Sequence, residues 1–217
     1  MRNLFIKELK LAASPLSFCF IGFGLMFFFP GYPILCGAFF ITLGIFQGFL
    51  HACGANDILF TALLPVNKSD VVKAKFLFAS FIECCGFIVM MTVTLIRMTV
   101  WKDAIAYRSN ALMNANFFAL AIALCIFGIF NFIFIGGFFK TAYRFTAPFI
   151  KYSIISFLII GGAETAHHIP ALSALNAFGY DHIFLQSLIL LGGIALFLCL
   201  TFGACGRSIR RFDAIDL

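Results

Sequence analysis

Six apolar runs, separated by polar connections, constrain what this chain can fold into more than any other feature. The runs cover 16–29, 34–50, 76–96, 117–139, 148–163 and 182–204. A helix needs about 20 apolar residues to cross the hydrocarbon core of a bilayer. The first two runs are short for that length, so we expect their ends to extend into interfacial positions, unless the two form a re-entrant pair.

The overall composition supports a membrane location. The chain is 63% apolar and 11% charged, whereas soluble domains carry about 25% charged residues. The core of a water-soluble domain of 217 residues cannot absorb so much apolar surface. We therefore expect a single-domain, all-α integral membrane protein, 1–217, with six transmembrane helices.

Basic residues are distributed unevenly between the two sides that six spans define. One side holds only Arg97, Lys102 and Arg108, and the other holds the remaining twelve of the fifteen Lys and Arg residues. Because Lys and Arg favour the cytoplasmic side, we expect both termini, the loop 51–75 and the tail 205–217 in the cytoplasm. No basic patch is interleaved with stacking aromatics, so nucleic acid is not expected as a partner.

The first fourteen residues, 1–14, have the pattern of an amphipathic helix that lies in the membrane interface. On a helix, a polar stripe and an apolar stripe separate cleanly. The polar stripe holds Asn3, Lys7, Lys10 and Ser14, and the apolar stripe holds Leu4, Phe5, Leu9 and Ala12. The proline that follows at position 15 marks the turn into the membrane.

The loop after the second run is more than a simple connection. Asn56 and Asp57 supply helix-start chemistry, and Pro65 ends the apolar run that follows them. Ser69 and Asp70 then begin a second helix that leads into the third span. The pattern predicts a short apolar helix at the membrane surface. Two alternatives stay open: this helix lies among lipid headgroups, or it fits a groove on a partner protein.

Three of the polar residues inside the apolar runs are candidate functional residues. Glu83 is an intramembrane acid and therefore a functional candidate; alternatively, it reaches the cytoplasmic interface or pairs with a cation of a neighbouring helix. Gln47 and Asn131 are explained by interhelical hydrogen bonds.

The most metal-like group is Glu164, His167 and His168, which Asp181 and His182 could join in space. An exposed loop is the favoured interpretation, and a weak external divalent-metal site stays open. The eight cysteines are interpreted as apolar packing residues. The phosphate-loop pattern GxxxxGK[ST] is absent, so the chain cannot hydrolyse ATP by that route. The alternative to a non-enzymatic role is an intramembrane metal-dependent or lipid-modifying enzyme that uses Glu83 or the Glu164 group.

Three segments of the first third carry a family resemblance. They are K-E-L-K-L in the amphipathic helix, P-G-Y-P between the first two runs, and N-D-I-L-F-T-A-L-L-P-V-N-K-S-D-V-V-K-A-K-F after the second. Together they resemble the ABC-2 family of ABC-transporter permeases, in particular the small bacterial branch that includes permease subunits of phenol-soluble-modulin exporters. The rest of the chain matches by span count and topology.

The resemblance implies a fold and a function. Six spans follow an N-terminal elbow helix, and a cytoplasmic coupling helix between spans two and three docks on a separate ATPase, which binds ATP and Mg. The docking residues carried over are Asn56, Asp57, Leu59, Leu63, Pro65, Lys68 and Asp70. The chain itself is then a permease subunit with no cofactor, no metal and no catalytic residue.

The partners implied by the resemblance are an ABC ATPase subunit and a second permease chain, in a homodimer or heterodimer. Membrane lipid surrounds the spans. The cargo implied is an exported hydrophobic or amphipathic peptide, modulin-like or antimicrobial, and the location is the bacterial cell membrane.

Overall fold

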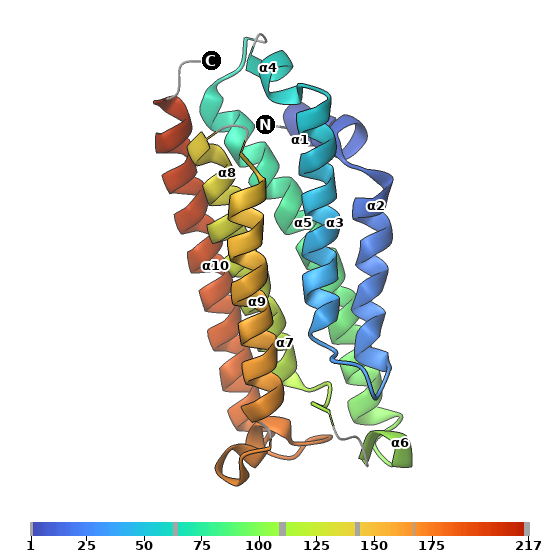
Figure 1. Cartoon of the computed structure of the whole chain (residues 1–217). Coiled ribbons are helices and arrows are strands. Elements are labelled where there is room, and N and C mark those ends of the chain that lie inside the picture. The colour runs from blue at the N-terminus through green and yellow to red at the C-terminus, as the bar shows by residue number, and fades with distance from the viewer. Residues whose placement is uncertain (1, 63–64, 109–111, 142–143, 167, 215–217) are drawn as a thin grey trace.

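The computed structural model describes residues 2–62, 65–108, 112–141, 144–166 and 168–214, and no strand occurs in this part of the chain. The helices form one elongated bundle, and both termini lie at the same end of it (Figure 1). We call this the basic end, because most of the Lys and Arg residues gather there. They lie on α1 (Arg2–Lys7), η1 (Glu8–Ala12), the start of α5 (Lys68–Thr99), α8 (Gly136–Thr141) and the end of α10 (Ile183–Asp213). The predicted all-α membrane fold is confirmed.

In the part of the chain that the structure describes, five helical segments are long and apolar enough to cross a membrane. They are α3 (Cys36–Gly54), α5 (Lys68–Thr99), the continuous segment Phe117–Lys140, α9 (Thr146–Ala166) and α10 (Ile183–Asp213). The segment Phe117–Lys140 is built from α7 (Phe117–Ile129), the π-helix η3 (Phe130–Ile135) and most of α8 (Gly136–Thr141). A sixth crossing is counted when Arg2–Lys10 and Pro15–Phe28, which meet at a bend of 91°, are taken together.

The first predicted span is the shortest. It consists of α2 (Pro15–Cys19) and the 3₁₀-helix η2 (Phe20–Phe28), and the Ser14 side chain caps its start by accepting a hydrogen bond from Leu16 N at 3.3 Å. A 3₁₀-helix rises about 2.0 Å per residue and an α-helix about 1.5 Å, so these residues extend about 25 Å. The 3₁₀ winding thus lets a short run nearly match a hydrocarbon core of about 30 Å.

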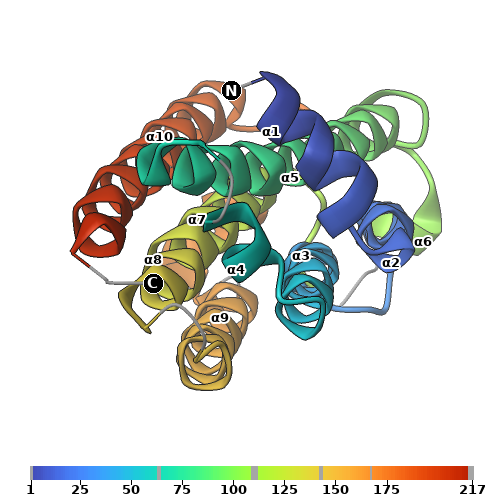
Figure 2. The ribbon, with the colours of Figure 1, turned by 90° about the horizontal axis from the view of Figure 1, so that it is seen from above.

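The predicted interfacial helix consists of α1 (Arg2–Lys7) and the π-helix η1 (Glu8–Ala12), and it lies across the basic end (Figure 2). Leu4 is buried, and Phe5 packs edge to face on Phe81 of α5 with ring centroids 6.0 Å apart. Glu8 is also buried, so the charged side of this segment faces protein as well as solvent.

Two helices extend further at the basic end than the apolar runs predicted. α5 begins at Lys68, with Asn67 in the N-cap position, so the predicted helix start at Ser69 and Asp70 is late by one or two residues. α10 continues to Asp213, and Arg211 Nη1 donates a hydrogen bond to Gly136 O at 3.3 Å. The predicted tail 205–217 is therefore helical as far as Asp213, and Arg207 of this part lies 4.6 Å from the Phe132 ring centroid of η3.

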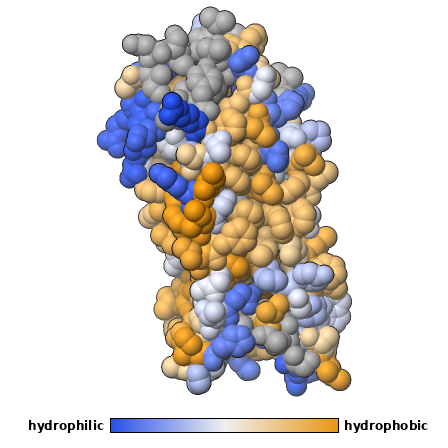
Figure 3. Space-filling model, in the orientation of Figure 1, coloured by the Kyte–Doolittle hydropathy of each residue, from blue (hydrophilic) through white to orange (hydrophobic). Residues whose placement is uncertain are grey.

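Aromatic side chains fill much of the core around α7 and η3. Phe46 of α3 stacks on Phe149 of α9 with centroids 3.8 Å apart, and Phe134 of η3 packs edge to face on both. Close helix contact depends on glycine where α10 meets α7: a Cβ at Gly193 would lie 2.9 Å from Ala121 Cα. On the outside, a hydrophobic band crosses the middle of the bundle, and hydrophilic side chains gather towards both ends (Figure 3).

Candidate functional site

The short helix predicted between the second and third spans is α4 (Asp57–Ala62), and it lies at the basic end (Figure 1). α3 ends at Gly54, and Asn56 then takes a left-handed conformation with φ of 51°. Asn tolerates this conformation better than most residues, and it turns the chain so that α4 begins at the next position. Seen along the bundle, α4 crosses its end between α3 and α5 (Figure 2).

Four charged side chains from three segments meet beneath α4. Lys75 Nζ on α5 lies 2.8 Å from Glu8 Oε2 and 3.2 Å from Asp57 Oδ2. Lys7 Nζ lies 2.5 Å from Asp57 Oδ1 and 3.4 Å from Glu8 Oε1, and it donates a hydrogen bond to Thr61 Oγ1 at 2.7 Å. We call Lys7, Glu8, Asp57 and Lys75 the four-charge cluster. Its two positive and two negative charges balance one another.

The four-charge cluster is almost closed to solvent: the side chains of Glu8 and Lys75 are each 3% exposed. Burial by itself would raise the pKa of Asp57, but the ammonium groups of Lys75 and Lys7 outweigh burial and lower that pKa below its usual value. Desolvation offsets most of the attraction in a buried ion pair, whereas removal of one partner leaves an uncompensated charge. The cluster therefore fixes the position of α4 against η1 and α5 more than it adds net stability.

The predicted docking residues do not all face the same way. Asn56 and Pro65 are exposed. The Asp57 carboxylate points inward into the four-charge cluster. Lys68 and Asp70 are half-buried at the start of α5, where Asp70 Oδ1 lies 3.4 Å from Lys73 Nζ.

Two of the predicted docking residues, Leu59 and Leu63, lie partly or wholly outside the residues that the structure describes. Leu59 belongs to α4, but its side chain is outside the described residues, as is all of Leu63. Sequence reasoning did not single out Phe60, which is 62% exposed on α4. The available signal was the presence of an aromatic residue in the apolar stretch between Asp57 and Pro65.

The intramembrane acid forms the second polar site. Glu83 is fully buried on α5, and its Oε2 accepts a hydrogen bond from Asn131 Nδ2 at 2.9 Å. The same Nδ2 donates to Thr201 Oγ1 on α10 at 3.0 Å. Glu83 thus neither reaches the interface nor pairs with a cation among the described residues. Asn131 lies in η3, whose π-helical turn adds a residue to the helix at a polar contact.

The predicted interhelical role of Asn131 agrees with its hydrogen bond to Glu83. Gln47 is half-buried on α3 and is not part of the contacts among Glu83, Asn131 and Thr201. A further buried contact was not predicted: Thr42 Oγ1 on α3 and Tyr152 Oη on α9 lie 2.6 Å apart. A single hydroxyl group hardly changes the apolar periodicity of a helix, so the sequence does not indicate this contact. The tertiary fold brings the two residues together.

The Glu164 group lies at the other end of the bundle. Glu164 Oε2 accepts a hydrogen bond from Met113 N at 3.0 Å and so holds the connection between α5 and α7 against α9. His168 is exposed, and His167 falls outside the described residues. Within the described ranges, no three His, Cys, Asp or Glu residues are grouped as a metal ion would need.

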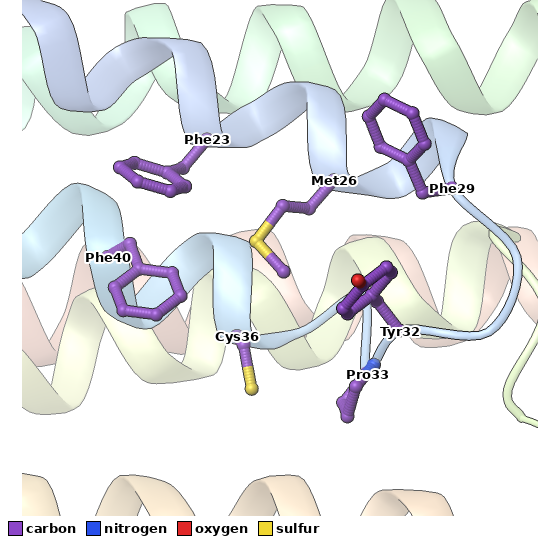
Figure 4. A pocket seen from close by; sticks show the side chains of 7 residues that line it. All are labelled: Phe23, Met26, Phe29, Tyr32, Pro33, Cys36 and Phe40. Carbon is purple, nitrogen blue, oxygen red and sulfur yellow. The ribbon is translucent and has the colours of Figure 1, made fainter.

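An apolar pocket of about 510 Å³ opens between η2 and α3 near the same end (Figure 4). Aromatic, thioether and thiol side chains converge on it from both helices and from the turn between them. Its lining residues are Phe23, Met26, Phe29, Tyr32, Pro33, Cys36 and Phe40. Its lining suits an alkyl or aromatic group and provides no charged residue.

Comparison with known proteins gives one match. The model of a family described as ABC-2 family transporter protein matches residues 3–212. No curated protein and no solved structure matches the chain.

Proposed function

The chain belongs to the ABC-2 family of transporter proteins, and on that premise we propose that it couples ATP hydrolysis by a separate ATPase subunit to the export of hydrophobic or amphipathic peptides. It is the membrane-spanning permease subunit of an ABC transporter. The ATPase subunit holds ATP and Mg, and the basic end faces the cytoplasm of a bacterial cell membrane, as the excess of Lys and Arg there favours.

The observation that carries the proposal is the link between α4 and the third span. α4 presents Phe60 outward, while Asp57 on the same helix is bound to Lys75 of α5 at 3.2 Å. A partner that docks on α4 and moves it would have to separate Asp57 from Lys75. Separating a buried ion pair has a high free-energy cost, because each charge is then left without its partner. The motion therefore passes to α5, and through Glu8 to the elbow helix. Such a linkage suits conformational coupling, in which this chain makes no covalent bond.

Two further features support the proposed peptide cargo and the proposed second permease chain. The apolar pocket between η2 and α3 and a second apolar groove of about 410 Å³ between α5 and α10 suit cargo with alkyl and aromatic groups. Many apolar side chains of α9 and α10 are exposed in the single chain, for example Leu158 and Phe202. A second permease chain and membrane lipid together would cover these faces.

Co-purification and reconstituted transport test the proposal. The tagged chain is extracted in mild detergent from its native membrane, the ATPase subunit that accompanies it is quantified, and ATP-driven uptake of a labelled amphipathic peptide is measured in vesicles. We expect Phe60→Asp to remove the ATPase subunit and abolish uptake while the chain still inserts. Ile105→Asp is the matched control, because Ile105 is equally apolar and 81% exposed at the opposite end.

The outcomes separate the parts of the proposal. Loss of ATPase binding with Phe60→Asp but not with Ile105→Asp supports docking on α4. Normal ATPase binding and transport by a correctly inserted Phe60→Asp chain would remove α4 from the docking surface. ATPase binding without peptide uptake would leave the permease role intact and reject the peptide cargo.

A further inference from the structure

We propose that a pocket between α8 and α9 at the basic end binds the phosphate-bearing headgroup of an anionic phospholipid. The pocket has a volume of about 330 Å³, and three of the seven described residues that line it are cationic: Lys140, Arg144 and Lys151. The other lining residues are apolar. The four-charge cluster and the Glu83 site lie on other helices, so this pocket is separate from both.

The geometry of the pocket follows from a close contact between the two helices. A Cβ at Gly137 would lie 2.9 Å from Pro148 Cβ, so α8 and α9 are in close contact at this pair. Lys140 follows Gly137 by three residues and Lys151 follows Pro148 by three, which places each Lys about one helical turn from the contact. Each helix thus supplies one Lys beside this contact, and Arg144 in the connection between the helices supplies the third cation.

The two lysines of the pocket have no acidic partner among the residues that the structure describes. None of the described lining residues is acidic, and neither Lys140 nor Lys151 forms an ion pair with an acidic residue in the described ranges. All three cationic side chains are exposed. Converging Lys and Arg donors around a small pocket match the oxygen atoms of a phosphodiester, and basic pockets between membrane helices are a recurrent means of headgroup recognition.

The surface below the pocket identifies the ligand as a lipid. Ile154, Ile155 and Leu158 follow Lys151 by three, four and seven residues, so they lie on the same face of α9. They are 57%, 36% and 70% exposed. A headgroup held by Lys151 would therefore place its acyl chains along an apolar stripe that continues into the membrane. A soluble phosphate compound would use the pocket but gain nothing from this stripe.

Native mass spectrometry of the full chain tests the site. The protein is titrated with phosphatidylglycerol in detergent micelles that also contain phosphatidylcholine, and bound lipid per chain is counted. We expect wild type to retain phosphatidylglycerol in preference to phosphatidylcholine, and Lys140→Gln with Lys151→Gln to weaken that binding about tenfold or more. The charge-retaining pair Lys140→Arg with Lys151→Arg should bind within about twofold of wild type, since Arg also binds phosphate.

The matched control is Lys10→Gln with Arg210→Gln. Both residues are exposed, both belong to helices of the basic end, and the pair removes the same charge outside the pocket. We expect it to leave phosphatidylglycerol binding nearly unchanged. Equal loss in the control and pocket variants would overturn the proposal in favour of diffuse attraction to an anionic surface, as would unchanged binding after Lys140→Gln with Lys151→Gln.

A soluble competitor separates lipid from free phosphate. sn-Glycerol 3-phosphate carries the phosphate without acyl chains, so we expect it to displace phosphatidylglycerol only at far higher concentration. Displacement at equal concentration would overturn the assignment to a lipid. Gel filtration and thermal unfolding of each variant confirm that the exposed substitutions leave the fold intact.

Discussion

Lys75 and Glu8, 67 positions apart in the chain, form an ion pair of 2.8 Å at the basic end in which each side chain is 3% exposed. The pair joins the third span to the elbow helix, and Asp57 joins α4 to the same ammonium group at 3.2 Å. Since Lys75 also lies 5.6 Å from the Phe49 ring centroid, this one cation on α5 contacts η1, α4 and α3. The stability and coupling of this end therefore depend on single charges that can be removed one at a time.

Removal of the shared cation should be strongly destabilising. Lys75→Gln leaves Glu8 and Asp57 buried with only Lys7 between them, and we expect it to lower the free energy of unfolding by about 3 kcal/mol or more. Lys73→Gln is the matched control on the same helix, because Lys73 is 45% exposed and pairs with Asp70 at 3.4 Å. An exposed pair contributes about 0–1 kcal/mol. Denaturant unfolding in detergent, followed by circular dichroism, measures both; similar losses in the two variants would contradict the central role of Lys75.

Acid should weaken the same cluster. The pKa of Asp57 is lower in the folded chain than its usual value, so the folded state binds fewer protons than the unfolded state at this residue. The stabilisation is fully present above the usual Asp pKa of about 3.9 and is lost as the pH falls from there through the lowered pKa. We expect wild type to be more stable than Asp57→Asn at neutral pH. The difference should shrink below about pH 4, and a difference that grows with acid would contradict the predicted sign.

Glu83 should act as a hydrogen-bond acceptor between helices. Glu83→Gln keeps an oxygen for Asn131 Nδ2, so we expect it to insert, to fold within about 1 kcal/mol of wild type and to transport peptide. Glu83→Leu leaves Asn131 without this acceptor, and we expect a loss of about 1–3 kcal/mol. Thermal unfolding measures the stability of both variants, and vesicle uptake measures their peptide transport. Loss of uptake in a stable Glu83→Gln chain would show that the carboxyl group itself takes part in transport.

The contact between α7 and α10 provides a test of packing with a neighbouring control. Gly193→Ala places a methyl group 2.9 Å from Ala121 Cα, so the helices must separate. We expect a loss of about 1–3 kcal/mol, as for other overpacked contacts. Gly192→Ala meets no atom within 4 Å and should be neutral or slightly stabilising, because Ala favours helix over Gly. Equal stability of the two variants would mean that α10 does not pack as described.

The spans and the surface helix were predictable from sequence because they depend on local patterns. Apolar runs predicted α3, α5, α7 and the helices after them, and Asp57 with Pro65 bounded a short helix that the structure contains as α4. The positions of ends were less certain. α10 passes the end of its apolar run, and there Arg211 donates a hydrogen bond to Gly136 of α8. No periodicity within the segment of α10 indicates this contact.

The inward direction of Asp57 and the partner of Glu83 could not be predicted. Asp57 at a helix start has the same sequence signature whether its carboxylate caps the helix, meets a partner protein or binds Lys75. Glu83 and Asn131 are 48 positions apart, and both were singled out as polar residues in apolar runs. Their pairing depends on the π-helical turn of η3 and on the packing of α5 against it, which are properties of the whole bundle.

The shortness of the first span has a consequence for the surrounding bilayer, because the 3₁₀ winding of η2 reduces the mismatch in length without removing it. Pro15–Phe28 extends about 25 Å, several ångströms less than a typical hydrocarbon core. Local thinning of the bilayer beside this helix keeps the polar groups at its ends out of the hydrocarbon core, at a modest energy per ångström of mismatch. The chain therefore carries a built-in preference for thinner membrane on one flank, and lipids with shorter acyl chains should gather there.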